Sequence, residues 1–228
     1  TLGRISAQAA KQVIFQKVRD AEQEKIYGEF APRLGEIITG IVRRFENDNI
    51  VLEVNRTEAL FPSREKLPTE VFERGAMVKA LITQVQKTTK GPQIFVSRTH
   101  PRFLAKLIEL ETPEIGDGQI EIRDLVRQPG ERAKVAVFSR ERDIDPVGAC
   151  IGVKGNRILS ISKELQGEKI DVIEWSANPP VYAKSALSPA RIERVVVIDT
   201  AQKVMQALVA KDQLSLAIGK KGINVKLA

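Results

Sequence analysis

The stretch Asp145-Pro-Val-Gly-Ala-Cys-Ile-Gly-Val-Lys-Gly-Asn-Arg-Ile158 places a Gly-X-X-Gly loop between two segments that read as helices. The same arrangement returns near the end of the sequence, in Asp212-Gln-Leu-Ser-Leu-Ala-Ile-Gly-Lys-Lys-Gly222. Each copy has an aspartate at the same spacing before an Ile-Gly pair, and each closes with Lys-Gly. One copy alone is a weak motif, whereas two copies in the same register indicate a repeated structural unit.

The chemistry of this loop suits an anionic chain. A first glycine can end a helix with positive φ, and a second glycine begins the next helix, whose free N–H groups attract an anion. Lys154, Lys220 and Lys221 add positive charge, and Ile151 and Ile218 would form the floor of a groove for bases. KH domains use this geometry to hold about four nucleotides of a single strand.

Two other interpretations of the loops have to be weighed. The plainer one is a pair of ordinary helix–glycine–helix turns with solvated lysines. A phosphate-binding NTPase loop is not predicted, because neither copy has the Gly-x-x-x-x-Gly-Lys-Ser/Thr spacing.

Composition narrows the class of protein. A chain of 228 residues suggests two to three small domains, and a net charge of +7 favours an anionic partner. The single cysteine, Cys150, excludes an intramolecular disulfide, fits the reducing cytoplasm and is expected to be a small buried side chain. With one cysteine and His100 as the single histidine, we predict neither a metal site nor a cofactor. No apolar run is long enough for a membrane span, and we expect a monomer.

The first half of the chain predicts a helix followed by a small barrel. An amphipathic helix is expected from Ser6, as its N-cap, to about Tyr27, and its apolar stripe needs a neighbour. Five short strands are then expected at 36–43, 50–54, 58–61, 76–85 and 93–97, which favours an all-β OB-fold barrel. Such barrels bind single strands on an aromatic and basic face. The residues available for that face, some of whose phenylalanines must be core, are Phe45, Phe61, Phe72, Phe95, Arg43, Arg44, Lys87 and Lys90.

The second half predicts two α/β units of the type II KH order. Helices are expected at 102–111, 145–151 and 156–165, and strands at 119–126, 133–138 and 169–175. After a stiff link at Asn178-Pro179-Pro180, the order restarts with a helix at 181–187, strands at 191–198 and 203–210, and a helix at 214–218. Because the sequence ends at Ala228, we expect the second unit to be truncated. The predicted domains are 1–33, 34–100, 101–177 and 178–228.

An OB barrel followed by two KH units resembles the NusA family of bacterial transcription factors. The resemblance covers nearly the whole chain. It is carried by Gln8-Ala-Ala-Lys-Gln-Val-Ile14, Lys17-Val-Arg-Asp-Ala-Glu22, Thr88-Thr-Lys-Gly-Pro-Gln-Ile94, Ser97-Arg-Thr-His-Pro101, Asp145-Pro-Val-Gly-Ala-Cys150, Glu168-Lys-Ile-Asp171, Ala186-Leu-Ser-Pro-Ala190 and Asp212-Gln-Leu-Ser-Leu-Ala-Ile-Gly219.

The resemblance implies a non-catalytic, cytoplasmic factor that binds nascent single-stranded RNA and modulates pausing, termination and antitermination. It also implies RNA polymerase as a partner, mainly through a missing N-terminal domain, together with other elongation and antitermination factors. The chain departs from the family at Ile223, where a polar residue is usual. The RNA contacts implied are Gly152, Val153, Lys154, Gly155, Asn156, Arg157, Gly219, Lys220, Lys221, Gly222 and Asn224, beside Ile151 and Ile218.

Two other functions compete with this one. The chain resembles the RNA-binding part of an exoribonuclease in its domain types, but the order of its domains argues against that reading. Asp143 and Asp145 would be the metal pair, although Asp145 is better explained as a helix N-cap. The second alternative is a protein-interaction scaffold in which the loops merely pack.

Overall fold

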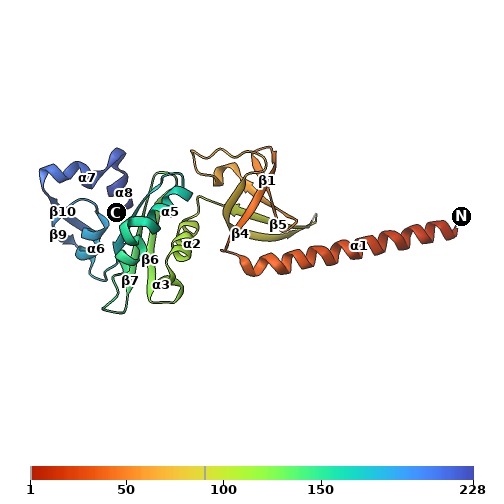
Figure 1. The fold of residues 1–228 in the computed structure, drawn as a ribbon, viewed down its shortest axis with the longest axis horizontal. Coiled ribbons are helices and arrows are strands. Elements are labelled where there is room, and N and C mark those ends of the chain that lie inside the picture. The colour runs from red at the N-terminus through yellow and green to blue at the C-terminus, as the bar shows by residue number, and fades with distance from the viewer. Residues whose placement is uncertain (1, 90) are drawn as a thin grey trace. The chain divides into compact units, whose positions relative to one another are not determined.

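The computed structural model describes residues 2–89 and 91–228, which form two compact units. One unit holds the residues up to Lys66 together with Val71–Phe103, and the other holds Leu67–Glu70 together with Leu104–Ala228. In Figure 1 the first unit is coloured red to yellow, and the Leu104–Ala228 part of the second unit is coloured green to blue. None of the helices in the described ranges is long and apolar enough to cross a membrane.

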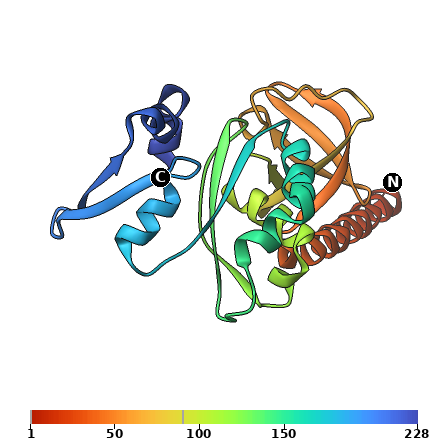
Figure 2. The same ribbon diagram turned by 60° about the vertical axis from the view of Figure 1, so that its left-hand side comes forward.

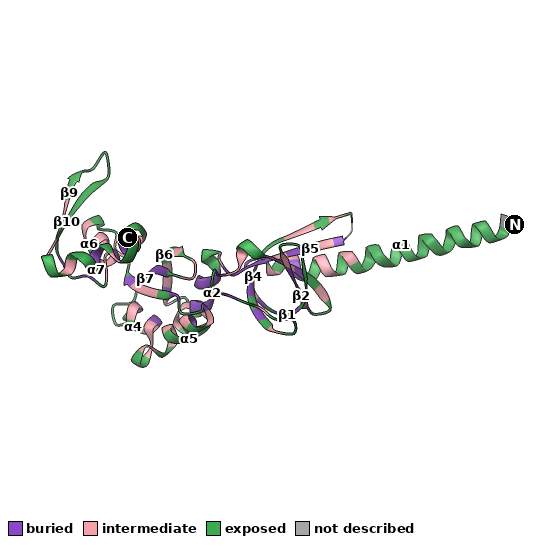
Figure 3. Ribbon diagram, turned by 90° about the horizontal axis from the view of Figure 1, so that it is seen from above, coloured by how far each residue is buried: buried purple, intermediate pink, exposed green. Residues whose placement is uncertain are grey.

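The first helix, α1 (Leu2–Phe30), is longer than the sequence predicts. Ser6 lies inside the helix rather than at an N-cap, and Gly28 does not end it. The last turn persists because Phe30 is fully buried in the core of the barrel, with Ile26 packed against the same core. Burying a phenylalanine outweighs the helical cost of one glycine, which is about 1 kcal/mol. Elsewhere α1 is largely exposed (Figure 3).

The five expected strands form a closed barrel in the order β1-β2-β3-β5-β4. Only the β3–β5 pair is parallel among the described strand pairs of this barrel. Closure between β1 and β4 removes the sheet edges, as in OB-like barrels. The strands are β1 (Ile37–Glu46), β2 (Asn49–Val54), β3 (Thr57–Pro62), β4 (Met77–Thr88) and β5 (Gly91–Ser97).

The first KH unit has the expected order of helices and strands. Its sheet runs β6-β7-β8, with β6–β7 antiparallel and β7–β8 parallel. Figure 2 shows the helices of this unit gathered on one side of the sheet. The short α3 was not predicted. The elements are α2 (Pro101–Glu111), α3 (Pro113–Gly116), β6 (Ile120–Gln128), β7 (Arg132–Ser139), α4 (Pro146–Ile151), α5 (Asn156–Glu164) and β8 (Lys169–Glu174).

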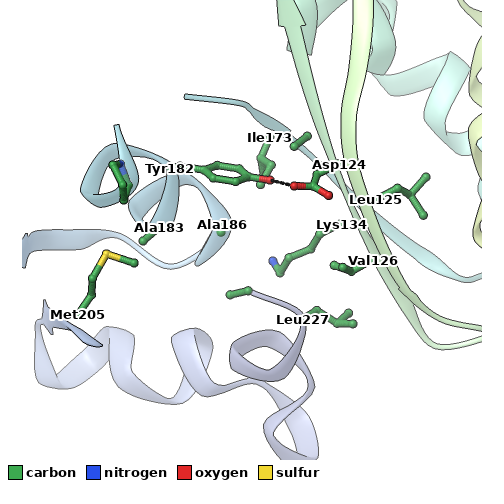
Figure 4. A pocket seen from close by; sticks show the side chains of 13 residues that line it. Asp124, Leu125, Val126, Lys134, Ile173, Tyr182, Ala183, Ala186, Met205 and Leu227 are labelled. Atoms are coloured by element: carbon green, nitrogen blue, oxygen red, sulfur yellow. Dashed lines mark hydrogen bonds between the residues drawn. The ribbon is translucent and has the colours of Figure 1, made fainter. Parts of the chain in front are cut away.

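The second KH unit begins directly where a linker was predicted. Pro179 and Pro180 are the first residues of α6, because proline lacks only an N–H that the first helical turn leaves unpaired. Ala186 of α6 packs on the first sheet against Ala136 and Ile173. The hydroxyl of Tyr182 donates to Asp124 Oδ2 at 3.4 Å (Figure 4). The elements are α6 (Pro179–Ala186), β9 (Ile192–Asp199), β10 (Val204–Val209), α7 (Leu214–Ile218) and α8 (Ile223–Leu227).

Candidate nucleic-acid interface

The two glycine loops have nearly the same backbone. Gly152 and Gly219 have φ/ψ of 77°/173° and 77°/167°. Lys154 and Lys221, at the third position, are left-handed at 53°/24° and 54°/24°. The closing glycines are also left-handed, at 76°/14° and 73°/12°. The first position lies in a region that essentially only glycine adopts, so the sequence pattern specifies the loop conformation directly.

Close neighbouring atoms also exclude a side chain at the first glycine of each loop. A Cβ on Gly152 would lie 2.4 Å from Asn156 Oδ1 and 2.7 Å from Arg157 Cγ. A Cβ on Gly219 would lie 2.7 Å from Asn224 Cβ and 2.9 Å from its backbone nitrogen. The helix after each loop therefore sits directly against the first glycine.

The first loop is held by a cap and a guanidinium. Asp145 accepts hydrogen bonds from the N–H groups of Val147 and Gly148, which confirms it as the N-cap of α4. Arg157 donates from Nη1 to the Ala149 carbonyl at 2.7 Å and to Glu114 Oε2 at 3.0 Å. A hydrogen bond from its own backbone N–H, with the Arg157 guanidinium beside it, holds the pKa of Glu114 below its usual value.

In the second loop, the side-chain amide of Asn224 takes the place that the Arg157 guanidinium has in the first loop. Asn224 is fully buried and donates from Nδ2 to the carbonyls of Ala217 at 2.9 Å, Leu187 at 3.1 Å and Leu216 at 3.4 Å. Leu216 precedes its glycine by the same spacing as Ala149 precedes Gly152, so Arg157 and Asn224 are equivalent ties between the helices around each loop. Both side chains therefore have hydrogen-bond partners inside the protein.

The remaining loop side chains face solvent. Val153 is 79% exposed, and Lys154, Lys220 and Lys221 are exposed as well. Ile218 is 43% exposed, whereas its counterpart Ile151 is half-buried. Asn156 is exposed and accepts a hydrogen bond from the backbone N–H of Arg157. Except for Ile151, these side chains are therefore accessible to solvent in the loop conformation described.

Cys150, in the last turn of α4 before the first loop, is fully buried, as expected. Burial raises the pKa of its thiol to about 11, so it stays protonated at neutral pH. Within residues 2–89 and 91–228, no group of three histidine, cysteine, aspartate or glutamate side chains is arranged to hold a metal ion.

The barrel face predicted from aromatic and basic residues is only partly present. Phe61 is fully buried, and Phe72 packs edge-on against it at 5.7 Å between ring centroids, so both belong to the core. Phe45 remains 54% exposed. The cations on this surface are paired with carboxylates: Arg43 with Glu53, Arg44 with Glu46 and Glu58, and Lys87 with Glu24. Lys90 lies outside the described residues.

Sequence reasoning missed a cavity beside the second loop. Its volume is about 500 Å³, and it joins that loop to the starts of β7 and β8 of the first KH unit. Strand pairing sets Arg132 opposite Lys169, a contact between distant residues that no local sequence pattern indicates. The lining residues are Glu131, Arg132, Lys169, Ser215, Leu216, Gly219, Lys220, Lys221 and Ile223.

Two carboxylates, one fully buried and one largely buried, fix the strands at this cavity. Glu168 accepts two hydrogen bonds from Arg127, at 2.7 and 2.8 Å, and a third from the N–H of Gly130 at 2.7 Å. Asp171 pairs with Arg132 at 2.7 Å and Lys134 at 3.1 Å. Both carboxylates belong to the Glu168–Asp171 motif noted in the sequence, which therefore has a structural role in shaping the turn between β6 and β7.

Comparison with known families finds matches along the chain. Residues 98–175 match the NusA-like first KH domain, residues 179–228 the NusA-like second KH domain, and residues 1–24 the NusA N-terminal domain.

Curated relatives match the chain over almost its whole length. The transcription termination/antitermination proteins NusA of Halalkalibacterium halodurans and Bacillus subtilis are 49% and 48% identical over 226 residues. Each alignment covers 99% of this chain, and it covers 59% and 61% of those two proteins. The NusA protein of Mycobacterium bovis is 42% identical over 234 residues, 99% of this chain and 67% of that protein. The chain thus spans about three-fifths of the first two relatives.

Proposed function

Because this chain belongs to the NusA family, we propose that it is a single-stranded RNA-binding part of a transcription termination/antitermination protein. The observation that carries this proposal is the repeated glycine loop. Two loops of the same backbone conformation present Val153 with Lys154, and Lys220 with Lys221, to solvent. Loops of this kind let a phosphodiester backbone approach the peptide plane closely, with lysine charge beside it.

Nascent RNA is the proposed ligand, and RNA polymerase and other elongation or antitermination factors are the proposed partners. The relatives are named for transcription termination and antitermination rather than for an enzymatic activity. We therefore assign the chain a non-catalytic role in pausing, termination and antitermination. The cytoplasm, where bacterial transcription takes place, is the location that this role requires.

The test is a titration of single-stranded RNA at several salt concentrations. We expect log affinity to fall with log salt, by about 0.7 for each phosphate neutralised on a single strand. The double variant Val153→Asp/Lys154→Asp should weaken binding more than tenfold, roughly 1.4 kcal/mol. The double variant Lys220→Asp/Lys221→Asp tests the second loop in the same way, and circular dichroism checks that each variant is folded.

Two outcomes would count against this assignment. Affinity without a salt slope would favour the scaffold alternative, in which the loops merely pack. Unchanged affinity in both folded double variants would move RNA binding away from the glycine loops.

A further inference from the structure

The cavity beside the second loop carries an excess of positive charge. Four cationic side chains line it, two from the first KH unit and two from the second loop, against the single carboxylate of Glu131 among the described lining residues. The four are Arg132, Lys169, Lys220 and Lys221. A cavity of this charge is a candidate for an anion that both KH units share.

We propose that Arg132 and Lys169 of the first KH unit and the second glycine loop form one composite phosphate site. It would bind a nucleotide of the same RNA strand that the loops hold. This inference rests on the proposed function and deepens it, because it adds to the RNA path a phosphate site that includes residues outside both glycine loops. Arg132, Lys169 and Glu131 are thereby given roles in RNA recognition that the Gly-X-X-Gly pattern does not contain.

Hydrogen bonding at Arg132 supports the site. Its side chain is 8% exposed, and its Nε donates to Asp171 Oδ2 at 2.7 Å. Its Nη2 is buried and has no hydrogen-bond partner within residues 2–89 and 91–228. A buried guanidinium nitrogen without an acceptor costs free energy, so an unpaired donor in a native structure calls for an explanation. A turn of the guanidinium toward the cavity that Arg132 lines would give this nitrogen a phosphate acceptor, and the planar guanidinium suits phosphate oxygens.

The charge balance around Asp171 points the same way. One carboxylate serves two buried cations, Arg132 and Lys134. Burial lowers the pKa of Lys134, and the nearby charges of Arg132 and Lys169 lower it further, while Asp171 opposes the shift. The cations therefore repel one another at a place where water screens them poorly. A bound anion would relieve that repulsion.

The lining also indicates a nucleotide rather than a small inorganic anion. Leu216 and Ile223 lie on the wall beside the lysines, so the cavity offers apolar as well as cationic surface. A phosphate with its attached sugar and base uses both kinds of surface, whereas inorganic phosphate uses only the charges. The Glu168 contacts to Arg127 and Gly130 hold the turn that leads into Arg132, so the cationic wall is rigid before RNA arrives.

The experiment measures binding of a fluorescently labelled oligoadenylate of about 12 nucleotides, long enough for two clamps of about four each. Lys169→Gln should weaken binding about fivefold and reduce the salt slope by about 0.7. Glu131→Gln should strengthen binding about twofold, because it removes a repulsive charge. The matched control is Lys184→Gln, an exposed lysine of α6 outside the cavity lining, which should leave the affinity unchanged.

The decisive comparison is between the affinity loss of each double variant and the product of the losses of its two single variants. Lys169→Gln combined with Lys221→Gln should lose less than the product of the two single losses, because both side chains serve one phosphate site. Lys169→Gln combined with Lys154→Gln should lose the full product, although Lys169 and Lys154 belong to the same KH unit. Arg132→Gln should weaken binding at least as much as Lys169→Gln. If Arg132→Gln fails to fold, Lys169→Gln decides the matter alone.

Failure of this inference differs from failure of the proposed function. If the loop variants lose RNA while Lys169→Gln and folded Arg132→Gln keep wild-type affinity and salt slope, the composite site is wrong and the loops remain the RNA site. If the unmodified chain shows no salt-dependent binding, the proposed function itself fails. If Lys169→Gln abolishes binding of inorganic phosphate but leaves the affinity for the oligoadenylate unchanged, the cavity belongs to a free anion and the proposal is overturned.

Discussion

The two glycine loops reach the same backbone by different means. The first is tied by a half-buried guanidinium, Arg157, whose second partner is the carboxylate of Glu114. The second is tied by the fully buried amide of Asn224, with three carbonyl acceptors and no carboxylate. The aspartate that precedes each loop also behaves differently, since Asp145 caps its helix and Asp212 lies in a short 3-10 turn before α7.

The comparison shows which features of the loop are common to both units and which differ between them. The backbone conformation depends on the first glycine and on a donor that reaches back to the preceding helix. The two middle residues are not constrained in this way, and they differ in chemistry: Val153 with Lys154 in the first loop, and Lys220 with Lys221 in the second. Shape is therefore shared between the two units, while charge is specific to each.

The largest effect is expected from alanine at the first glycine. Gly219→Ala should destabilise the fold by about 3 kcal/mol, because its backbone conformation excludes other residues and its Cβ would meet backbone atoms of buried Asn224. Gly152→Ala should cost less, about 2 kcal/mol, because its Cβ would meet only side-chain atoms, the end of Asn156 and the stem of Arg157, in place of backbone atoms. Urea unfolding followed by the fluorescence of Trp175, the single tryptophan, measures both.

The closing glycines supply matched controls. A Cβ on Gly155 would meet nothing closer than 3.9 Å, and a Cβ on Gly222 would meet nothing within 4 Å. Alanine there should cost about 1 kcal/mol, the ordinary penalty of a left-handed residue. Equal losses at all four glycines would show that conformation alone matters and that the close approach of the following helix does not.

The second prediction concerns the ties. Asn224→Ala should destabilise the second KH unit by about 2 kcal/mol, since it leaves buried carbonyls without a donor. Arg157→Ala should cost about 1 kcal/mol, because the Ala149 carbonyl and Glu114 are less buried and water can replace the guanidinium. If folded Arg157→Ala also lowers the RNA salt slope by about 0.7, then Arg157 contacts phosphate directly as the family resemblance implies.

Much of this fold can be predicted from the sequence because it depends on interactions between residues that are close together in the chain. Alternating apolar residues predicted all five barrel strands, and the glycine pairs with their flanking helices gave the KH order. The N-cap predicted at Asp145 is confirmed, and so is the burial of Cys150, which its apolar neighbours indicate. Each of these follows from chemistry within a few residues.

The errors arise where distant residues decide. Helix α1 passes Gly28 because Phe30 is buried in a barrel that follows it in the chain, which no local pattern reveals. Two consecutive prolines are compatible both with a linker and with the first turn of a helix. Pro179 and Pro180 form the first turn of α6, and Ala186 of this helix packs on the first sheet, a contact that the local sequence does not indicate. Arg132 and Lys169 are far apart in the sequence and meet only through strand pairing, so the cavity between the KH units could not be predicted.

A third prediction exchanges the chemistry of the two loops. Val153→Lys gives the first loop the Gly-Lys-Lys-Gly sequence of the second, and it should tighten RNA binding about threefold and raise the salt slope by about 0.7. Lys220→Val makes the reverse change and should weaken binding to a similar extent. Both positions are exposed, so circular dichroism should show no change in fold. A loss of affinity in Val153→Lys would show instead that the apolar valine itself contacts the RNA.

The smallest expected effect is a pH dependence confined to the first loop. The pKa of Glu114 is lowered in the folded chain, chiefly by a hydrogen bond from its own backbone N–H and also by Arg157, so its charge stabilises the fold above the unfolded value of about 4.5. This stabilisation is lost as pH falls through the lower folded value, when the carboxylate is protonated. At pH 7, Glu114→Gln should lower stability by about 0.5 kcal/mol, as for a partly exposed ion pair, and the difference should vanish once the pH lies below the lowered pKa of Glu114. Amide exchange at Gly155 should follow this change, while exchange at Gly222 should not, because Asn224 carries no charge to titrate. A matching acid-induced rise in exchange at both glycines would mean that the loops open together, and the distinction between the two ties would then have no consequence for their stability.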